Sequence, residues 1–512
     1  EETLAEIQEP ELGHVISINK RAKQFGALDL GSNSFHLVIA KENHGRIQIL
    51  DRHKETVRLA EGLTKNKKIT KAAEDRALAC LKRFAERLQA VNTKDVRAVG
   101  TSAFRRASNS KGFLRRAEKI LGKPIEIVSG YEEARLIYLG VCSNYEHGEN
   151  PSLVVDIGGG STEIIFGENL TPTTLNSLNI GCITISQKFF PKGIATKKGM
   201  DRAINQALAE IEPVKHEFLK HSWSICLGAS GTVNTVFAVA SSLMANPIID
   251  LETLNQIAAK LIYASSNNGN SLEGVPEDRQ AVFPGGLAIL IALFRALNID
   301  KMEVSEGALR EGLLQDMVGR SYDRDTRELT VSNLADRYRI DRTQSEQVRD
   351  TVMTFLSQVA MTWELTETTH KNLLSWSSAL HEIGMDISHT GYQKHGGYLI
   401  ENLVMPGFSK SDQSDLARIV RNHRRKFTQD DFGKRKNSKF LKMTILLRLA
   451  ALLHRGRNHE PIPHVQVEAR KKEISLSFSK QWFEGHPLTI LDLENETKYL
   501  KSQGVVLVVK TH

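Results

Sequence analysis

Few residues in this chain could build a disulfide framework, a zinc site or a membrane span. The 512 residues contain only four cysteines, Cys80, Cys142, Cys182 and Cys226, which lie far apart and form no C-x-x-C pair. Their spacing indicates buried thiols of a reducing cytosol and excludes a cysteine-based zinc or redox site. The longest strongly apolar run, residues 285–294, is about half the ~20 residues that span a bilayer. We therefore expect no integral membrane association.

The first 24 residues also lack a feature, the apolar core of a signal peptide. They carry charges of both signs, so we expect a lead-in segment and a cytoplasmic protein. The rest of the chain has the ordinary composition of globular proteins, with 40% hydrophobic residues. A chain of 512 residues should form several domains, because single cores stop growing near ~250–300 residues. The net charge of +8 allows an anionic partner without requiring one.

One short pattern occurs twice, as ALDLGSNSFHLVI from Ala27 and as VVDIGGGSTEIIF from Val154. In each copy an apolar run reaches Asp-x-Gly-x-x-Ser and becomes apolar again, which predicts a strand, a tight glycine turn and a second strand. Such turns let backbone amides approach an anion, and the aspartate at the strand end can hold Mg²⁺ or its water shell. Two unrelated hairpins would not explain why Asp, Gly and Ser recur in one register. The repeat predicts two phosphate-binding loops.

The pattern along the chain changes twice. Strand and helix signals alternate up to about residue 320, with helices expected at 197–220, 284–297 and 308–319. Beyond Asp323 the strand signals vanish, and the apolar spacing favours helices. Alternation returns from His464, where a β-hairpin around a charged turn is expected, and residues 504–510 could add a last strand.

Six motifs carry a resemblance to a known family. The chain resembles the exopolyphosphatase and guanosine pentaphosphate phosphohydrolase family, within the actin, sugar-kinase and heat-shock chaperone superfamily. The motifs, in family order, are DLGSNSFH from Asp29, GTSAFRR from Gly100, SGYEEARLIYLG from Ser129, DIGGGSTE from Asp156, GASGT from Gly228 and GALREG from Gly307. Six ordered blocks are far more specific than one glycine motif.

The resemblance implies an α/β fold of the duplicated actin-like type, followed by an all-α domain like that of the His-Asp phosphohydrolases and a small C-terminal β domain. We expect a lead-in segment at 1–24, actin-like domain I at 25–136 and actin-like domain II at 137–320. The helical domain III should cover 321–459, and the β domain IV should cover 460–512.

The resemblance also assigns roles to carboxylates. Glu133 falls on the family's water-activating carboxylate, although a pair of acids in a first helical turn is common for electrostatic reasons alone. Its neighbour Glu132 is expected to be a solvated or supporting residue. Asp156 and Glu163 match the metal carboxylates, and Asp29 could add an outer-sphere contact. Mg²⁺ usually takes one or two protein carboxylates plus phosphate and water oxygens.

Further residues are expected to bind phosphate. Arg105 could offer a guanidinium fork to phosphate oxygens, whereas Arg106 could equally be a surface charge. The remaining candidates offer backbone amides or hydroxyl groups from three glycine-rich turns, and any one serine among them could be a simple turn former. They are Gly31, Ser32, Asn33, Ser34, Gly158, Gly159, Gly160, Ser161, Ser230 and Thr232.

The helical region contains histidines that resemble a His-Asp metal scaffold. A glutamate, Glu382, follows His381 where the scaffold has aspartate, and no convincing upstream histidine is present. We interpret the region as a relic scaffold, because metal sites tolerate ligand loss poorly. The sequence does not settle whether His381 and Glu382 bind metal.

A basic stretch from Arg418 to Arg448 is the remaining signal. It could be a solvated helix face, or it could hold a polyphosphate chain between cleavages. The residues proposed for this polymer track are Arg421, Arg424, Arg425, Lys434, Arg435 and Lys436. No nucleic-acid module or aromatic platform accompanies the charge, so nucleic acid is not an expected partner.

The resemblance implies a Mg²⁺-dependent exopolyphosphatase that releases terminal orthophosphate from inorganic polyphosphate. The alternative within the family is removal of the 5′ γ-phosphate of pppGpp, giving ppGpp, or both activities. A kinase or a nucleotide-binding regulator of the same fold is less favoured. Mn²⁺ is an alternative metal, K⁺ an expected activator, guanosine penta- and tetraphosphate expected substrates or inhibitors, and a homodimer the expected assembly. Chain-length preference, processivity and the number of metals do not follow from the sequence.

Overall fold

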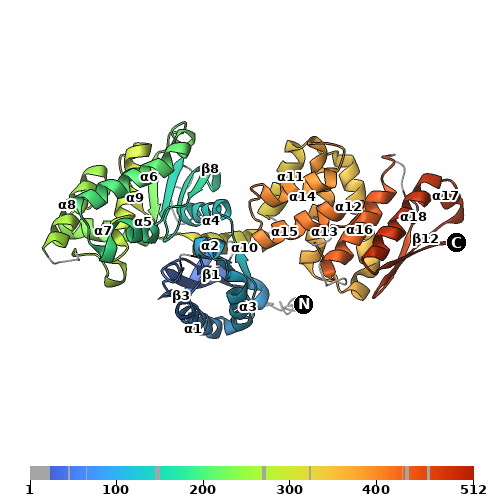
Figure 1. Ribbon diagram of the computed structural model, residues 1–512, viewed down its shortest axis with the longest axis horizontal. Helices are drawn as coiled ribbons and strands as arrows, with labels where there is room; N and C mark the ends of the chain where they lie inside the picture. Colours follow the sequence, from blue (N-terminus) through green and yellow to red (C-terminus); the bar gives the residue numbers. More distant parts are fainter. Residues whose placement is uncertain are drawn as a thin grey trace, which may run out of the picture.

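The computed structural model describes residues 23–43, 46–64, 66–143, 150–267, 272–321, 325–428, 431–432, 438–457 and 462–512. Most of the expected lead-in segment, residues 1–22, lies outside this set. Figure 1 shows an elongated molecule, with an α/β part at one end and a helical part that carries the C-terminus at the other. Within the described residues, no helix is long and apolar enough to cross a membrane.

Two five-stranded sheets organise the α/β part. The first contains β1 Gln24–Leu30, β2 Ser34–Asn43, β3 Arg46–Thr56, β4 Val96–Gly100 and β5 Ile125–Ile127, in the order β3-β2-β1-β4-β5. The second contains β6 Ser152–Ile157, β7 Thr162–Glu168, β8 Thr171–Leu178, β9 Ile225–Ala229 and β10 Glu303–Val304, in the order β8-β7-β6-β9-β10.

Both sheets have the same pairing pattern. The first three strands of each sheet form an antiparallel meander. The first of them, β1 or β6, lies at the centre of its sheet and also pairs in parallel with the fourth strand, β4 or β9. The fourth and fifth strands are parallel in both sheets. The duplicated α/β fold that the repeat predicted is therefore confirmed.

Helices cover these sheets and connect their parallel strands. They are α1 Lys71–Arg87, α2 Ser102–Arg106, α3 Ser110–Leu121, α4 Gly130–Ser143, α5 Cys182–Phe189, α6 Lys197–Phe218, α7 Gly231–Leu243, α8 Leu251–Ser266, α9 Phe283–Leu297 and α10 Leu309–Ser321. The Thr70 side chain caps α1 by accepting from the Ala73 amide. Most of α9 is apolar because the helix is buried on nearly every side. The helices expected at 197–220, 284–297 and 308–319 are confirmed within two residues at each end.

Helices α4 and α10 pack against each other between the two sheets. A Cβ at Gly140 would lie 2.0 Å from the Ala308 carbonyl oxygen, and one at Gly312 would lie 1.8 Å from the Leu136 carbonyl oxygen. Glycine is needed at both positions because the two backbones touch. The expected domain boundary between residues 136 and 137 falls inside α4.

The C-terminal part combines helices with a small sheet. Its elements are α11 Thr326–Arg337, α12 Arg342–Trp363, α13 Thr368–Leu380, α14 Tyr392–Asn402, α15 Lys410–Asn422, α16 Lys439–Leu453, β11 Gln466–Arg470, β12 Glu473–Phe478, α17 Lys480–Glu484, α18 Pro487–Ser502 and β13 Val506–Thr511. The expected hairpin is β11–β12, and β13 adds in parallel to β12. Apolar side chains of the sheet, such as Leu476 and Phe478, join one core with those of α12 and α16.

Candidate active site

The two repeated motifs form the same turn. The Gly31 amide donates to the Ser34 carbonyl at 3.2 Å, and the Gly158 amide donates to the Ser161 carbonyl at 2.9 Å. Each aspartate ends the central strand of its sheet. Asp29 lies opposite Val99 on β4, and Asp156 lies opposite Ala229 on β9. The predicted strand, glycine turn and second strand are confirmed in both copies.

The two loops face each other closely. A Cβ at Gly159 would lie 3.0 Å from Ser32 Cβ, and one at Gly160 would lie 2.8 Å from Ser102 Oγ. A larger residue at either position would push the two halves of the α/β part apart. Glycine is therefore needed at both positions because the two halves approach each other closely there.

A cavity of about 390 Å³ lies between the two halves. Most of the sequence-predicted site residues line it: Asp29, Gly31, Ser32, Asn33, Ser34, Glu133, Asp156, Gly158, Gly159, Ser161 and Ser230. Four others are not among its lining residues, namely Arg105, Gly160, Glu163 and Thr232.

Glu133 stands in the first turn of α4 and is paired with Arg105. Arg105 Nη1 donates to Glu133 Oε2 at 2.6 Å and to the Val128 carbonyl at 3.0 Å. Burial raises the pKa of Glu133, and the Arg105 charge opposes that shift. A carboxylate with a raised pKa is a better general base near neutral pH. In this arrangement Arg105 orients Glu133 instead of presenting its fork to the cavity, which differs from its predicted phosphate contact.

Three further carboxylates gather beside Glu133. Burial, with the negative charge of Glu133 added to it, raises the pKa of both Asp29 and Asp156 to about 7. The pKa of Glu163 lies well above its ordinary value for the same reasons, although Ser177 Oγ donates to Glu163 Oε1 at 2.8 Å. Asp29 Oδ1 is buried without a hydrogen-bond partner. So much uncompensated carboxylate in one place favours a bound cation.

The third glycine-rich turn carries backbone strain. Ser230 precedes α7 with φ 98° and ψ 161°, a region that is almost exclusive to glycine. Its Oγ is buried and has no hydrogen-bond partner, so the hydroxyl is available to a ligand. Thr232 Oγ1, by contrast, is close to the Ile157 carbonyl at 3.4 Å and accepts from Arg279 Nη2 at 3.3 Å.

Arginines that the sequence analysis did not assign supply the positive charge of the cavity. Arg279, Arg310 and Arg52 all line it, and Arg310 Nη1 is 2.7 Å from His36 Nδ1. Burial and the Arg310 charge lower the pKa of His36, so the ring is neutral and accepts from the guanidinium. Arg310 and His36 lie inside two of the family motifs, which was the available signal. Arg279 lies outside all six.

Comparison with known protein families identifies the family to which this chain belongs. Residues 38–321 match the model of the "Ppx/GppA phosphatase family", and residues 326–497 match the model of its domain III. The chain belongs to this family. It is a phosphoanhydride hydrolase with the duplicated actin-like fold of the family.

Curated relatives of the family cover nearly the whole chain. A protein of Aeromonas hydrophila named guanosine-5'-triphosphate,3'-diphosphate pyrophosphatase is 35% identical over 94% of this chain and 97% of its own length. A protein of the same name from Photobacterium profundum is 36% identical over 95% and 98%. The crystal structure of an exopolyphosphatase from Cytophaga hutchinsonii is 26% identical, with a TM-score of 0.53, over 58% of this chain and 98% of its own.

The residues present fit the Mg²⁺ that the family resemblance implies. Asp29 and Asp156 line the cavity, and Asp29 offers the unpartnered oxygen. Within the described ranges, no three His, Cys, Asp or Glu side chains are placed so that together they could hold one metal ion. This small ligand set suits Mg²⁺, which takes most of its ligands from water and substrate oxygens. Asp156 and Asp29 would hold the ion, with Glu163 behind them.

Asp156→Asn and Glu163→Gln are expected to raise the Mg²⁺ concentration for half-maximal activity. Each change removes one formal negative charge from the proposed ion site. The larger shift is expected for Asp156, because only Asp156 of the two lines the cavity. The measurement is a Mg²⁺ titration of orthophosphate release, with the exposed residue Glu168, changed to Gln, as the control. Unchanged titrations in both site variants would place the ion elsewhere.

The histidines of the helical part have other partners. His381 Nδ1 is 2.7 Å from the Ser378 carbonyl oxygen, and His423 Nδ1 is 2.6 Å from that of Val420. Burial lowers the pKa of both rings. Glu382 is paired with Arg457 at 2.6 Å. These contacts describe a packed, ion-paired cluster, and the relic interpretation stays a prediction.

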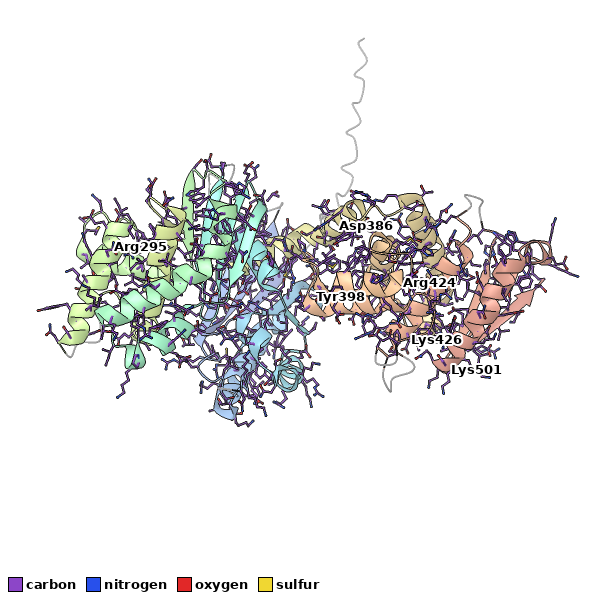
Figure 2. The ribbon with its side chains drawn as sticks, turned by 45° about the horizontal axis from the view of Figure 1, so that its top comes forward. Arg295, Asp386, Tyr398, Arg424, Lys426 and Lys501 are labelled. Carbon is purple, nitrogen blue, oxygen red and sulfur yellow. The ribbon has the colours of Figure 1, made fainter. Side chains whose placement is uncertain are left out.

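The residues proposed for the polymer track differ in their contacts, because some are paired or packed against other side chains and others are exposed. Arg421 is paired with Glu401 and Asp431, while Arg424 stacks over Tyr392 at 4.5 Å and Arg425 is exposed. Within the wider basic stretch, Arg448 is buried against Glu496. Lys434, Arg435 and Lys436 lie outside the described residues. Figure 2 shows Arg424 and Lys426 on the helical part.

Proposed function

We propose that this chain removes the 5′ γ-phosphate of pppGpp and releases ppGpp and orthophosphate. The observation that carries this proposal is the near full-length similarity, at 35–36% identity, to proteins named guanosine-5'-triphosphate,3'-diphosphate pyrophosphatase. The exopolyphosphatase structure is less similar and covers 58% of the chain. Sequence analysis alone favoured polyphosphate, and these relatives favour its alternative.

The cavity supports a substrate with two separate anionic groups. One wall contains the carboxylates, the glycine turns, Arg279 and Arg310, where the reacting phosphates would bind. Another wall comes from β2 and β3 and contributes Arg52, His53 and Lys54. Arg52 is half exposed at 49% of its side-chain surface, so it can meet an incoming anion. A 3′-diphosphate is the group that pppGpp would offer to this second wall.

The reaction needs an in-line water and positive charge on the transferred group. The water oxygen attacks the γ-phosphorus while Glu133 takes one proton of that water. The bond between the γ-phosphorus and the β–γ bridging oxygen breaks, and its electrons stay on the β-phosphate. Arg310, Arg279 and the glycine-turn amides would bind the equatorial and leaving oxygens. A Mg²⁺ held by Asp156 and Asp29 would neutralise charge on the β- and γ-oxygens.

Exopolyphosphatase activity is the second candidate. The observation that favours it is the run of three consecutive basic residues, Arg424, Arg425 and Lys426, in the helical part. A remote cationic surface can hold a polymer that one active site cannot neutralise. Mn²⁺ use, K⁺ activation, inhibition by guanosine tetraphosphate, a homodimer and a cytoplasmic location remain further predictions of the family resemblance.

Orthophosphate release from pppGpp, long-chain polyphosphate and ATP, measured side by side, tests the choice. We expect the highest kcat/KM for pppGpp, and we expect charge reversal of Arg424, Arg425 and Lys426 to Glu to leave it within about two-fold, because a compact substrate does not reach that surface. The control reverses Lys498 and Lys501, which also lie on the C-terminal part. A higher kcat/KM for polyphosphate, lost selectively and more steeply at low salt in the triple variant, would replace the proposal with the second candidate.

A further inference from the structure

A buried ionic network lies directly behind the first turn of α4. Arg135 donates to both oxygens of Glu132 at 2.8 Å, and its Nη2 also donates to Asp316 Oδ1 at 2.7 Å. Arg97 reaches the other oxygen of Asp316 at 2.7 Å, and Arg320 Nε is 2.9 Å from it. These three arginines hold the pKa of Asp316 below its ordinary value against the effect of burial. The network joins β4, α4 and α10 into one unit.

The network also forms hydrogen bonds to one residue of the helical part, Gly407. The Gly407 amide donates to Glu132 Oε2 at 2.8 Å, and Arg320 Nη2 donates to the Gly407 carbonyl at 3.0 Å. Both polar groups of the Gly407 backbone are thus bound by side chains of the α/β part. Glu132 is only 1% exposed, and hydrogen bonds to a buried charged group are among the strong ones. Figure 1 shows this junction, where α10 approaches α15.

The turn that presents Gly407 is held firmly on its own side. Gly407 has φ +86°, and a Cβ there would lie 2.9 Å from Arg327 Cγ. Thr330 of α11 donates to the Pro406 carbonyl at 2.8 Å. Phe408 packs edge-on against Trp376 of α13, with ring centroids 4.9 Å apart. A well-fixed turn of the helical part therefore contacts the carboxylate next to Glu133.

We propose that Glu132 is a positioning residue, through which the helical part fixes the first turn of α4 and so the orientation of Glu133. Adjacent residues on a helix point in different directions. Glu132 points back to the network and Gly407, whereas Glu133 faces the cavity and Arg105. Loss of the Gly407 contact lets this turn shift, and a misplacement of about 1 Å at a catalytic group can cost ~10²-fold in rate. The inference rests on the proposed role of Glu133 and holds for either substrate of the family.

The test compares two variants of the contact with two matched controls in the full chain. Gly407→Ala and Glu132→Gln are expected to lower kcat by roughly 10–100-fold and to leave KM within about three-fold, because binding groups stay in place. Gly391→Ala is the backbone control, since Gly391 has φ +73° and open space around its Cβ position. Glu126→Gln is the network control, since Glu126 pairs with Arg97 at the β4 side of the network, whereas the Gly407 amide donates to Glu132. Both controls should keep kcat within about two-fold.

The double variant Glu132→Gln/Gly407→Ala makes the inference specific. If both residues act through one hydrogen bond, the double variant should be no slower than the slower single variant. Should Gly407→Ala fail to fold, Glu132→Gln with its kcat-against-KM split still decides. Wild-type kcat in a folded Glu132→Gln, or an equal loss in Glu126→Gln, would overturn the positioning role. Those outcomes leave the proposed function intact, because that function is tested separately, by comparing orthophosphate release from pppGpp and polyphosphate and by the Glu133→Gln variant.

Discussion

Glu133→Gln is expected to lower kcat by roughly 10²–10⁴-fold, the usual loss when a general base is removed. The amide keeps the size of the side chain and can still accept from Arg105 Nη1, so the fold and the site geometry should persist. It cannot take a proton from water. Substrate binding should change little, because the Glu133 carboxylate and the substrate phosphates are both negatively charged, so this side chain contributes no electrostatic attraction.

The measurement is single-turnover orthophosphate release together with equilibrium binding of the substrate. Glu86→Gln is the control, because Glu86 is an exposed acid on α1. Activity of Glu133→Gln within a few-fold of the wild type would remove Glu133 from the role of base. A lost affinity with unchanged kcat would point instead to a binding role for this side chain.

Arg310→Ala is expected to lower kcat/KM by roughly 10²–10³-fold, as for the loss of one preorganised donor to a developing anion. Arg310 lines the cavity together with Asp29 and Asp156, and its positive charge opposes the rise in pKa that burial causes in both carboxyls. Its removal therefore takes away a phosphate ligand and leaves Asp29 and Asp156 with less compensating positive charge. The second effect should make the variant more dependent on Mg²⁺ than the wild type.

The comparison is with Arg295→Ala, an arginine on the exposed side of α9 that Figure 2 labels far from the junction of the two parts. Rates and Mg²⁺ titrations are measured for both variants. A near wild-type kcat/KM in Arg310→Ala would show that Arg310 is not the phosphate ligand, and would favour Arg105, the arginine that the sequence analysis predicted for this contact. Arg310→Lys should recover only part of the loss, because a lysine cannot reproduce the planar fork.

The catalytic loops were predictable because their chemistry is local. Asp-x-Gly-x-x-Ser contains the strand end, the turn and the donors within a few residues, and its repetition from Asp29 to Asp156 indicated two equivalent halves. The strand order confirms that equivalence. Helix positions followed from periodicity and caps in the same way, as at Thr70. In these segments the pattern and the fold depend on the same neighbouring residues.

The sequence pattern of the C-terminal β region did not show which helices its strands pack against. Alternation at Val465–Val467 and Ile474–Phe478 correctly indicated strands, but the sheet packs on α12, α16 and α18 and shares their core. Period-two patterns show which face of a strand is buried and not which element covers it.

The sequence by itself determined the family, the duplicated loops and the carboxylates at their ends, because each of these is written in consecutive residues. Only the tertiary structure decided which arginine side chains lie close to those carboxylates. Arg105 turns to Glu133, whereas Arg279 and Arg310 reach the cavity from positions more than 100 residues away from either loop aspartate. It also decided that Glu132 meets Gly407, 275 residues further along the chain. Long side chains take whichever partner folding brings within about 3 Å, and that distance is set by packing between domains, which no local pattern contains.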